Sequence, residues 1–440
     1  MNNKKWMAIL LGGIMAASLA APCSVSAAEK TTLTFWHAMG GTNGEVLQQI
    51  VDDFNASQDE IEIKAEYQGT YDDTITKLKA AMQSDSGLPD VCQMYDVGTK
   101  FMYDSGAVIP VEDKFESTGY DKSSVMDVIS SYYTVDGKQY AMPFNVSTPM
   151  LYYNKDVFEA AGLDPETPPT TYDEVLEDAK KIVDSGAAPV GYSQAIYGWF
   201  FEQQLAGLGV TYGNNDNGRK EAVTAVDFDS NGGGLKVFDM WKKLYDSGYF
   251  EDYGTTTADT QTAFFSGQVG MIIESTAILK NAVDSSPFEV GTGYLPRIEQ
   301  NDEGGVIIGG GSLWLTDTGN EANEDAAWKF IEYITTPDVQ AKWSMGTGYF
   351  AINEKAYETE DMKAYLKENP NFETAINQLK DSPVNCNTAG VLSGVQTEAR
   401  LTFNEIMPQV YDGKLTTQDA VDQLAASVNK AIENYNESIK

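Results

Sequence analysis

A run of alternating apolar residues, Thr32-Leu33-Thr34-Phe35-Trp36-His37, begins the stretch of sequence that decides the fold. This run predicts a β-strand, and the following segment Glu45–Phe54 carries apolar residues at helical spacing. An alternating strand at Ile61–Ala65, a helix at Tyr71–Met82 and a short apolar strand at Pro89–Met94 come next. Strands and helices that alternate in this order predict a parallel sheet with helices on its faces.

The same alternation returns later in the chain and predicts a second α/β unit. The expected strands are Met150–Tyr153, Val269–Ile273 and Val306–Leu315, and the expected helices are Tyr172–Asp184, Leu235–Tyr245, Thr260–Phe265, Asn323–Ile334 and Thr417–Tyr435. No Pro-rich linker or low-complexity tract separates the two units, so we expect two lobes joined by short structured crossings. A ligand in such a protein belongs in the cleft between the lobes, near strand ends and helix N-termini.

The first 27 residues predict an export signal. Lys4 and Lys5 precede an apolar run at Met7–Ala21, and the small residues Val25-Ser26-Ala27 offer a cleavage site. Cys23 leaves a second interpretation open, because the residues before it loosely resemble a lipoprotein box. We therefore expect an exported protein, periplasmic or at the cell surface, with a lipid anchor at Cys23 as the alternative to simple cleavage.

The expected mature chain is strongly acidic. Removing 27 of the 440 residues leaves 413, with 28 of the 30 basic residues and all 65 acidic ones, so the net charge is −37. This charge argues against nucleic-acid binding and against an anionic membrane surface. The same field repels an anionic ligand, so an anion needs local groups to bind it.

Cysteine and histidine are scarce beyond the leader. Cys92 and Cys386 allow one disulfide in an oxidising compartment, and His37 is the only histidine. A lone histidine excludes most zinc sites, Ser-His-Asp triads and Cys-His dyads. We expect no metal and no cofactor.

Six short segments carry a resemblance to one family. They are Phe35–Met39, Tyr95–Thr99, Pro143–Pro149, Leu151–Asp156, Ile307–Trp314 and Thr347–Tyr349. Together they resemble the extracellular solute-binding proteins of carbohydrate-type ABC importers, and most closely the members that bind sn-glycerol 3-phosphate. The resemblance runs from about Thr32 to the C-terminus.

This resemblance implies the periplasmic-binding-protein type II fold, with two α/β lobes joined by a three-crossing hinge. The crossings are expected near Phe144–Ser147, Tyr294–Arg297 and Gln340–Gly346. Residues 28–145 and 298–340 would form the N-terminal lobe, and residues 146–297 and 341–440 the C-terminal lobe. The resemblance also implies a monomer that closes on a small polar ligand and delivers it to an ABC permease in the cytoplasmic membrane, and it implies that the protein performs no chemistry.

The resemblance further implies a set of ligand contacts. They are Tyr71, Asp96, Ser147, Trp199, Ser275, Gly310, Tyr349 and Arg400. The sequence departs from the family pattern at two positions, because Asp96 stands where the family has Glu and Ile196 stands where it has a second tryptophan. A shorter carboxylate and a lost ring imply a wider or differently shaped pocket.

The side chains of this set suit a ligand with two different ends. Arg400 can grip a phosphate with a planar, two-pronged contact, and the serine and tyrosine hydroxyls add donors. A glycine at position 310 lets a ligand approach the backbone. Asp96 accepts hydrogen bonds from ligand hydroxyls, and Trp199 can cover the C–H face of a glycerol or sugar. We therefore expect sn-glycerol 3-phosphate or a related glycerophosphodiester.

Other interpretations remain open from the sequence alone. Arg400 could pair with Glu398 or Glu405, Asp96 could cap the helix that follows it, and Trp199 could pack in the core beside two phenylalanines. A neutral oligosaccharide is the alternative ligand for the same receptor. A secreted glycoside hydrolase with two catalytic carboxylates and a surface adhesin are more distant alternatives.

Overall fold

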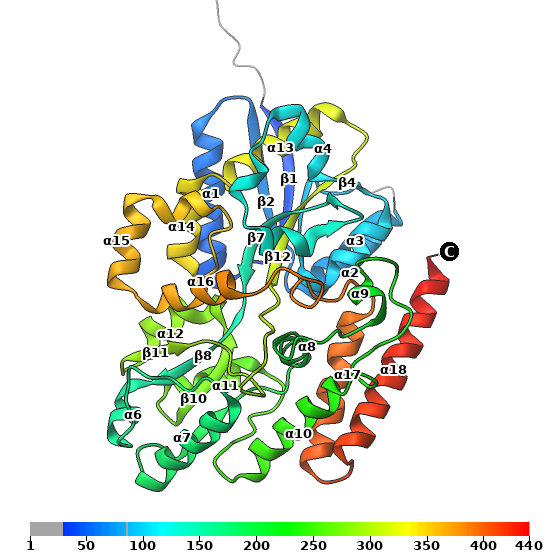
Figure 1. Ribbon diagram of the computed structural model, residues 1–440. Helices are drawn as coiled ribbons and strands as arrows, with labels where there is room; N and C mark the ends of the chain where they lie inside the picture. The colour runs from blue at the N-terminus through cyan, green and yellow to red at the C-terminus, as the bar shows by residue number, and fades with distance from the viewer. Residues whose placement is uncertain (1–29, 85–86, 440) are drawn as a thin grey trace, which may run out of the picture.

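Two separate β-sheets divide the chain into an upper and a lower lobe (Figure 1). The computed structural model describes residues 30–84 and 87–439. The predicted export signal and Cys23 lie outside these residues. None of the helices in the described ranges has the length and apolar character needed to cross a membrane.

The upper sheet has the strand order β2-β1-β3-β12-β4, and β7 pairs with β12 beside that path. The strands are β1 (Thr31–His37), β2 (Ile61–Tyr67), β3 (Val91–Tyr95), β4 (Val108–Ile109), β7 (Met142–Ser147) and β12 (Gly309–Thr316). β1 runs parallel to β2 and to β3, as the β-α-β-α-β pattern predicts. β12 returns from the lower lobe and pairs antiparallel with β3, β4 and β7.

Helices α1 (Gly41–Ser57) and α13 (Glu321–Ile334) pack together over this sheet. The apolar residues that predicted α1 are the ones that it buries: Leu47, Ile50, Val51 and Phe54. Phe54 meets Phe330 of α13 edge to face, with ring centroids 5.2 Å apart. Helical spacing in the sequence therefore translates directly into the face that covers the sheet.

The lower sheet has the order β11-β8-β10-β9. The strands are β8 (Pro149–Asn154), β9 (Val190–Ser193), β10 (Val269–Ser275) and β11 (Val290–Gly293). β8 is antiparallel to β10 and β11, whereas β9 is parallel to β10. The chain enters this sheet from the upper one within two residues, because β7 ends at Ser147 and β8 begins at Pro149.

The remaining elements surround the two sheets. The other helices are α2 (Tyr71–Met82), α3 (Thr99–Ser105), α4 (Val111–Thr118), α5 (Asp127–Ser130), α6 (Lys155–Ala160), α7 (Tyr172–Ser185), α8 (Gly198–Gly207), α9 (Asn214–Gly218), α10 (Gly233–Asp246), α11 (Thr257–Phe265), α12 (Leu279–Ser285), α14 (Pro337–Thr347), α15 (Glu360–Glu368), α16 (Asn371–Asp381), α17 (Gln396–Tyr411) and α18 (Thr417–Ser438). Short 3-10 helices are η1 (Asp96–Gly98), η2 (Lys122–Ser124), η3 (Ser131–Tyr133), η4 (Thr276–Ile278) and η5 (Glu354–Glu358), and strands β5 (Thr134–Val135) and β6 (Lys138–Gln139) form a small hairpin.

Two expectations from the sequence differ from the structure. The segment Gln340–Gly346, expected near a hinge crossing, lies inside helix α14, which packs against α1. Cys92 is buried in β3, Cys386 is half-buried, and both thiols are free, so the disulfide that the sequence allowed does not form. The assignment of residues 28–145, 146–297, 298–340 and 341–440 to the lobes remains a prediction.

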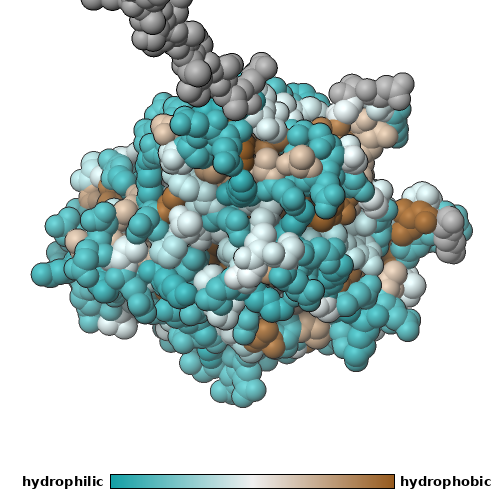
Figure 2. All heavy atoms as spheres, turned by 90° about the horizontal axis from the view of Figure 1, so that it is seen from above, coloured by the Kyte–Doolittle hydropathy of each residue, from teal (hydrophilic) through white to brown (hydrophobic). Residues whose placement is uncertain are grey.

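The outer surface agrees with the acidic composition. The face seen from above in Figure 2 is mainly hydrophilic, and its apolar residues form small separate groups rather than one patch. A highly charged surface of this kind favours solubility and disfavours association.

Helix α18 offers a test of how local sequence signals stabilise the fold. Its N-cap Thr416 and Asp419 form a reciprocal capping box. The substitution Thr416→Ala removes the Thr416 hydroxyl from this capping box and should lower the free energy of unfolding by about 1 kcal/mol. Urea unfolding followed by circular dichroism measures the change.

Thr402→Ala is the matched control. The Thr402 hydroxyl donates to the carbonyl of Glu398 within helix α17, where such a bond adds little to helix stability. An equal loss of stability in both variants would contradict the role of the capping box.

Candidate functional site

The buried guanidinium of Arg400 joins the two lobes. Its Nε donates to Oε1 of Glu202 at 2.8 Å, and its Nη2 donates to Oε2 of Glu202 at 2.8 Å and to Oδ2 of Asp96 at 2.7 Å. Glu202 and Arg400 belong to α8 and α17 beside the lower sheet, whereas Asp96 follows β3 of the upper sheet. All three side chains are less than a tenth exposed, so water screens these contacts weakly.

A glycine makes this arrangement possible. A Cβ at Gly198, the first residue of α8, would lie 2.5 Å from the Cα of Arg400. The backbone N–H of Gly198 also donates to Oδ1 of Asn404, which lies one turn further along α17. The two helices therefore touch backbone to backbone, and Glu202, one turn into α8, reaches the guanidinium.

Burial and charge act in opposite directions on these groups. Burial alone would lower the pKa of Arg400, but the charges of Asp96 and Glu202 hold it well above its ordinary value. Burial raises the pKa of Glu202, and Arg400 offsets only part of that rise. With all three groups ionised, the cluster carries one positive and two negative charges.

This ion pair corrects two of the sequence alternatives. Glu398 and Glu405 are exposed and do not pair with Arg400, and Asp96 binds the guanidinium rather than capping a helix. The sequence analysis missed Glu202. The signal that could have found it is a single carboxylate directly after the aromatic run Trp199-Phe200-Phe201.

Asn145 of β7 organises the upper wall of the site. Its Oδ1 accepts a bond from Gln93 at 2.7 Å, and its Nδ2 donates to the Tyr71 hydroxyl at 2.7 Å. Burial raises the pKa of Tyr349, while hydrogen bonding to Asn145 and Tyr71 lowers it in part. The two phenols and the amide therefore form one polar group.

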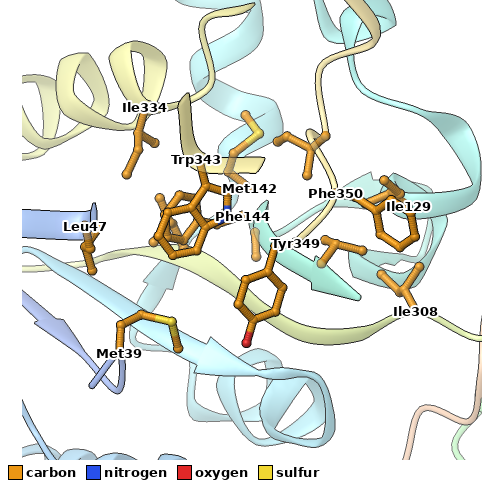
Figure 3. Close-up of a cluster of buried hydrophobic side chains, with 14 of the residues drawn as sticks. Met39, Leu47, Ile129, Met142, Phe144, Ile308, Ile334, Trp343, Tyr349 and Phe350 are labelled. Carbon is orange, nitrogen blue, oxygen red and sulfur yellow. The ribbon is translucent and has the colours of Figure 1, made fainter. Parts of the chain in front are cut away.

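The ring of Tyr349 is held by the apolar core of the upper lobe. It stacks on Trp343 with centroids 5.7 Å apart, and Trp343 stacks on Phe144 at 4.6 Å. Figure 3 shows the phenol oxygen of Tyr349 pointing away from this cluster of apolar side chains. Packing thus fixes the ring and leaves the hydroxyl for polar contacts.

A second contact between the lobes lies beside the ion pair. Tyr95 stacks on Tyr71 with centroids 5.0 Å apart, and its hydroxyl is 2.7 Å from Oγ1 of Thr397 on α17. The same hydroxyl donates to Asp72 at 2.8 Å. The end of β3 therefore meets the first turn of α17 through two adjacent groups, Tyr95 and Asp96.

The glycine run Gly309–Gly311 lets β12 touch both walls of the site. Gly310 has a φ of +89°, and a Cβ there would lie 1.9 Å from the carbonyl oxygen of Asn145. A Cβ at Gly309 would lie 2.8 Å from the indole ring of Trp199. No other residue fits at position 310, since both the backbone conformation and the space require glycine.

Trp199 packs in the core, and its contact with a ligand remains a prediction. It is 5% exposed and packs on Phe200 at a centroid distance of 5.6 Å, as a core residue would. Its Nε1, however, is buried without a hydrogen-bond partner among the described residues. A buried indole N–H normally finds a partner, so this donor is available to a ligand.

The two predicted serines lie at strand ends near the crossing between the sheets. Ser147 pairs in register with Gly309, and Ser275 ends β10 opposite Pro149. Ser275 Oγ also accepts the N–H of Ala277 at 3.1 Å and so begins the 3-10 helix η4. The structure therefore brings all eight predicted residues to the region where the lobes meet, and their contact with a ligand remains a prediction.

Comparison with known proteins decides the family. A family model described as bacterial extracellular solute-binding protein matches residues 49–374, well over half of the chain. The chain belongs to this family. The sn-glycerol-3-phosphate-binding periplasmic protein UgpB of Escherichia coli is 31% identical over 417 residues, which cover 93% of this chain and 94% of that protein.

Solved structures give the same fold. The UgpB protein of Mycobacterium tuberculosis in complex with glycerophosphocholine has a TM-score of 0.79 at 20% identity, covering 92% of this chain and 99% of that one. The cyclic alpha-maltosyl-1,6-maltose binding protein of Arthrobacter globiformis has a TM-score of 0.76 at 26% identity, covering 92% and 100%. These matches confirm the predicted type II periplasmic-binding fold.

Family membership settles the broad function. The protein is a non-enzymatic solute-binding receptor of an ABC importer, and such receptors bind small ligands and deliver them to ABC permeases. The glycoside hydrolase and adhesin alternatives are therefore wrong. Extracellular or periplasmic placement follows from the same family.

The ion pair predicts a large effect on stability. In Arg400→Gln, two buried carboxylates lose their cation, and the free energy of unfolding at about pH 8 should fall by about 3–5 kcal/mol. The deficit should shrink as the pH is lowered to about 5. Unpaired buried carboxyls have raised pKa values, so the folded variant takes up protons that relieve the penalty.

Denaturant unfolding at several pH values measures this effect. Glu405→Gln, an exposed change on the same helix, should alter stability by no more than about 0.5 kcal/mol. A deficit in Arg400→Gln that does not change with pH would show that the two carboxylates are not its cause.

Proposed function

We propose that this receptor binds sn-glycerol 3-phosphate or a related glycerophosphodiester in the cleft between the lobes. The observation that carries the proposal is the guanidinium of Arg400, which is buried between Glu202 on one lobe and Asp96 on the other. The ligand named for the 31%-identical relative supports the same assignment.

The contact between Arg400 and Asp96 suggests how the phosphate binds. Asp96 is an anion held at 2.7 Å by Nη2, while Glu202 already occupies the other edge of the guanidinium. A phosphate oxygen can take the place of Asp96 on Nη2. The released carboxylate then accepts hydrogen bonds from the glycerol hydroxyls, which suits its acceptor-only chemistry.

The charge of the cluster favours one member of this ligand class. Glu202 offsets the charge of Arg400 before any ligand arrives. A phosphomonoester carries a charge of about −1.5 to −2 at neutral pH, whereas a phosphodiester carries a single negative charge. A diester is therefore the better match to a guanidinium that is already paired.

Because Glu202 offsets the charge of Arg400, a neutral oligosaccharide is a second candidate ligand. Asp96 and Glu202 can accept hydrogen bonds from sugar hydroxyls, and Trp199 offers an aromatic face for sugar C–H groups. The maltosyl-binding relative of known structure has the same fold at 26% identity. In this case Arg400 holds the carboxylates in place and binds no anion.

Ligand binding shifts the equilibrium between open and closed lobes. Contacts from both lobes favour the closed form, and the ligand moves the population in proportion to its differential affinity for that form. Closure excludes water from the cleft and strengthens the charged contacts. The closed form is the one that the permease engages.

A thermal-shift screen tests the ligand class. The wild-type protein is heated with sn-glycerol 3-phosphate, glycerophosphodiesters, inorganic phosphate and maltooligosaccharides. A ligand at 100 times its Kd should stabilise the folded state by about 2.7 kcal/mol, and we expect this from the glycerophosphodiesters. Stabilisation by oligosaccharides alone would contradict the proposal.

A double variant tests the role of the guanidinium without leaving an extra charge. Arg400→Gln combined with Glu202→Gln removes one cation and one carboxylate together. Affinity for a glycerophosphodiester should fall by about 2–5 kcal/mol, whereas affinity for a neutral sugar should change little. Isothermal titration calorimetry measures both, and Arg297→Gln, an exposed arginine at the hinge, is the matched control.

A further inference from the structure

Glu274 is a buried carboxylate that forms no ion pair with any residue that the structure describes. It is 5% exposed and stands one residue before the end of β10, next to the predicted ligand residue Ser275. Its Oε1 accepts the N–H of Ser275 at 2.6 Å, and its Oε2 accepts Nε2 of Gln261 at 2.9 Å. Within residues 30–84 and 87–439, no lysine, arginine or histidine forms an ion pair with it.

Burying a carboxylate in this way is costly. Two neutral donors satisfy part of its hydrogen-bonding capacity but supply no opposite charge, and burial raises the pKa of Glu274. Buried charges in proteins are normally paired or bound to an ion. A buried carboxylate without a cation, at a cleft that binds a ligand, therefore points to a ligand that brings the cation.

Glu274 lies close to the crossing between the two sheets, because it pairs with Met150 at the start of β8 and precedes Ser275. β9 and β10 run parallel with Ser193 opposite Ile272, so the loop after β9 continues beside Glu274. This loop ends at Tyr197, the residue before α8. Burial raises the pKa of Tyr197, and the charges that act on its phenol are Arg400, Asp96, Glu202 and Glu274. The half-buried phenol of Tyr197 is therefore near enough to both the arginine cluster and Glu274 for their charges to act on it.

Tyr197, on which the charge of Glu274 acts, belongs to a small group of aromatic rings. Tyr197 lies against Trp199, with ring centroids 6.3 Å apart. Trp199 also carries the unpartnered buried indole N–H that faces the glycine run of β12. An aromatic face next to a carboxylate is the arrangement that binds alkylammonium groups, through cation–π attraction and charge.

The local charge count agrees with a cationic ligand group. The four groups whose charges act on Tyr197 are Arg400, Asp96, Glu202 and Glu274, and their net charge is −2 when all four are ionised. The half-buried guanidinium of Arg219 donates to backbone carbonyls instead, including those of Tyr132 at 2.9 Å and Gly390 at 3.1 Å. A ligand with a phosphate alone would leave Glu274 uncompensated.

We infer that Glu274 binds the ammonium group of a zwitterionic glycerophosphodiester, and that it selects such ligands over diesters with a neutral headgroup. This inference rests on the proposed function and deepens it. The phosphate lies at Arg400, the ammonium group lies at Glu274 beside Tyr197, and each end of the ligand meets the opposite charge.

Calorimetric titration of the full-length mature protein tests the inference. The probes are glycerophosphocholine, glycerophosphoethanolamine and glycerophosphoglycerol, which share the glycerol and the diester and differ in headgroup charge. In Glu274→Gln, affinity for the two ammonium-bearing probes should fall about 10-fold or more. Affinity for glycerophosphoglycerol should stay within about 3-fold, and Glu274→Asp should restore part of the ammonium preference.

Controls separate a ligand role from a structural one. Glu251→Gln, an exposed carboxylate near the same strand ends, should leave all three affinities unchanged. Glu274→Gln should melt at the same temperature as the ligand-free wild type or higher, because it removes an uncompensated buried charge. A uniform loss of affinity for all three probes would overturn the inference.

The remaining outcomes distinguish the inference from the proposed function. If the wild type binds glycerophosphoglycerol and Glu274→Gln leaves the headgroup preference unchanged, the inference fails and the proposed function stands. If the wild type binds sn-glycerol 3-phosphate but none of the three diesters, the inference fails and the proposed function stands. If it binds neither sn-glycerol 3-phosphate nor any of the three diesters, both fail.

Discussion

The structure depends on one shared cation, the guanidinium of Arg400. It is held by Glu202 from the same side of the cleft and by Asp96 from the other, and all three groups are buried. In such surroundings neither carboxylate can be left alone without a large penalty. The two lobes are therefore linked by this ion pair, and in the binding mode that we propose a ligand phosphate competes with the Asp96 carboxylate for the guanidinium.

Two glycines and a stacked tyrosine hold the neighbouring elements of the candidate site in position. Gly198 lets α8 approach α17 so that Glu202 reaches the guanidinium, and Gly310 lets β12 approach Asn145. Tyr349 is fixed by stacking on Trp343, which keeps its hydroxyl in position. Glycines therefore provide close approach and aromatic rings provide rigidity, while the polar groups keep donors and acceptors free for a ligand.

Sequence patterns predicted the local structure of the first lobe well. Helix α2 has the bounds that were expected, and the strands β1, β2 and β3 lie within two residues of their predictions, because periodicity and capping are local properties. Segments such as β7, α8 and α14 were not predicted as elements. Every residue of β7 is buried and α8 is buried along almost its whole length, so neither shows an amphipathic pattern, and α14 mixes polar and apolar residues without clear periodicity.

The residues of the candidate site could be predicted from the sequence, but the ion pairs between them could not. The resemblance supplied the eight residues that the fold brings together, yet no local pattern showed that Arg400 pairs with Glu202, which is 198 positions away. The same limit applies to Glu274, whose lack of a cation becomes visible only when its surroundings are known. Charge pairing across a cleft is a property of the tertiary structure, so it has to be read from the fold.

A crystal structure of the protein with a bound glycerophosphodiester tests the central claim most directly. The account predicts a phosphate oxygen within about 2.7–2.9 Å of the Arg400 guanidinium, with the Asp96 carboxylate moved onto the glycerol hydroxyls. A bound ligand whose phosphate lies away from Arg400, with the bond between Arg400 and Asp96 intact, would contradict it.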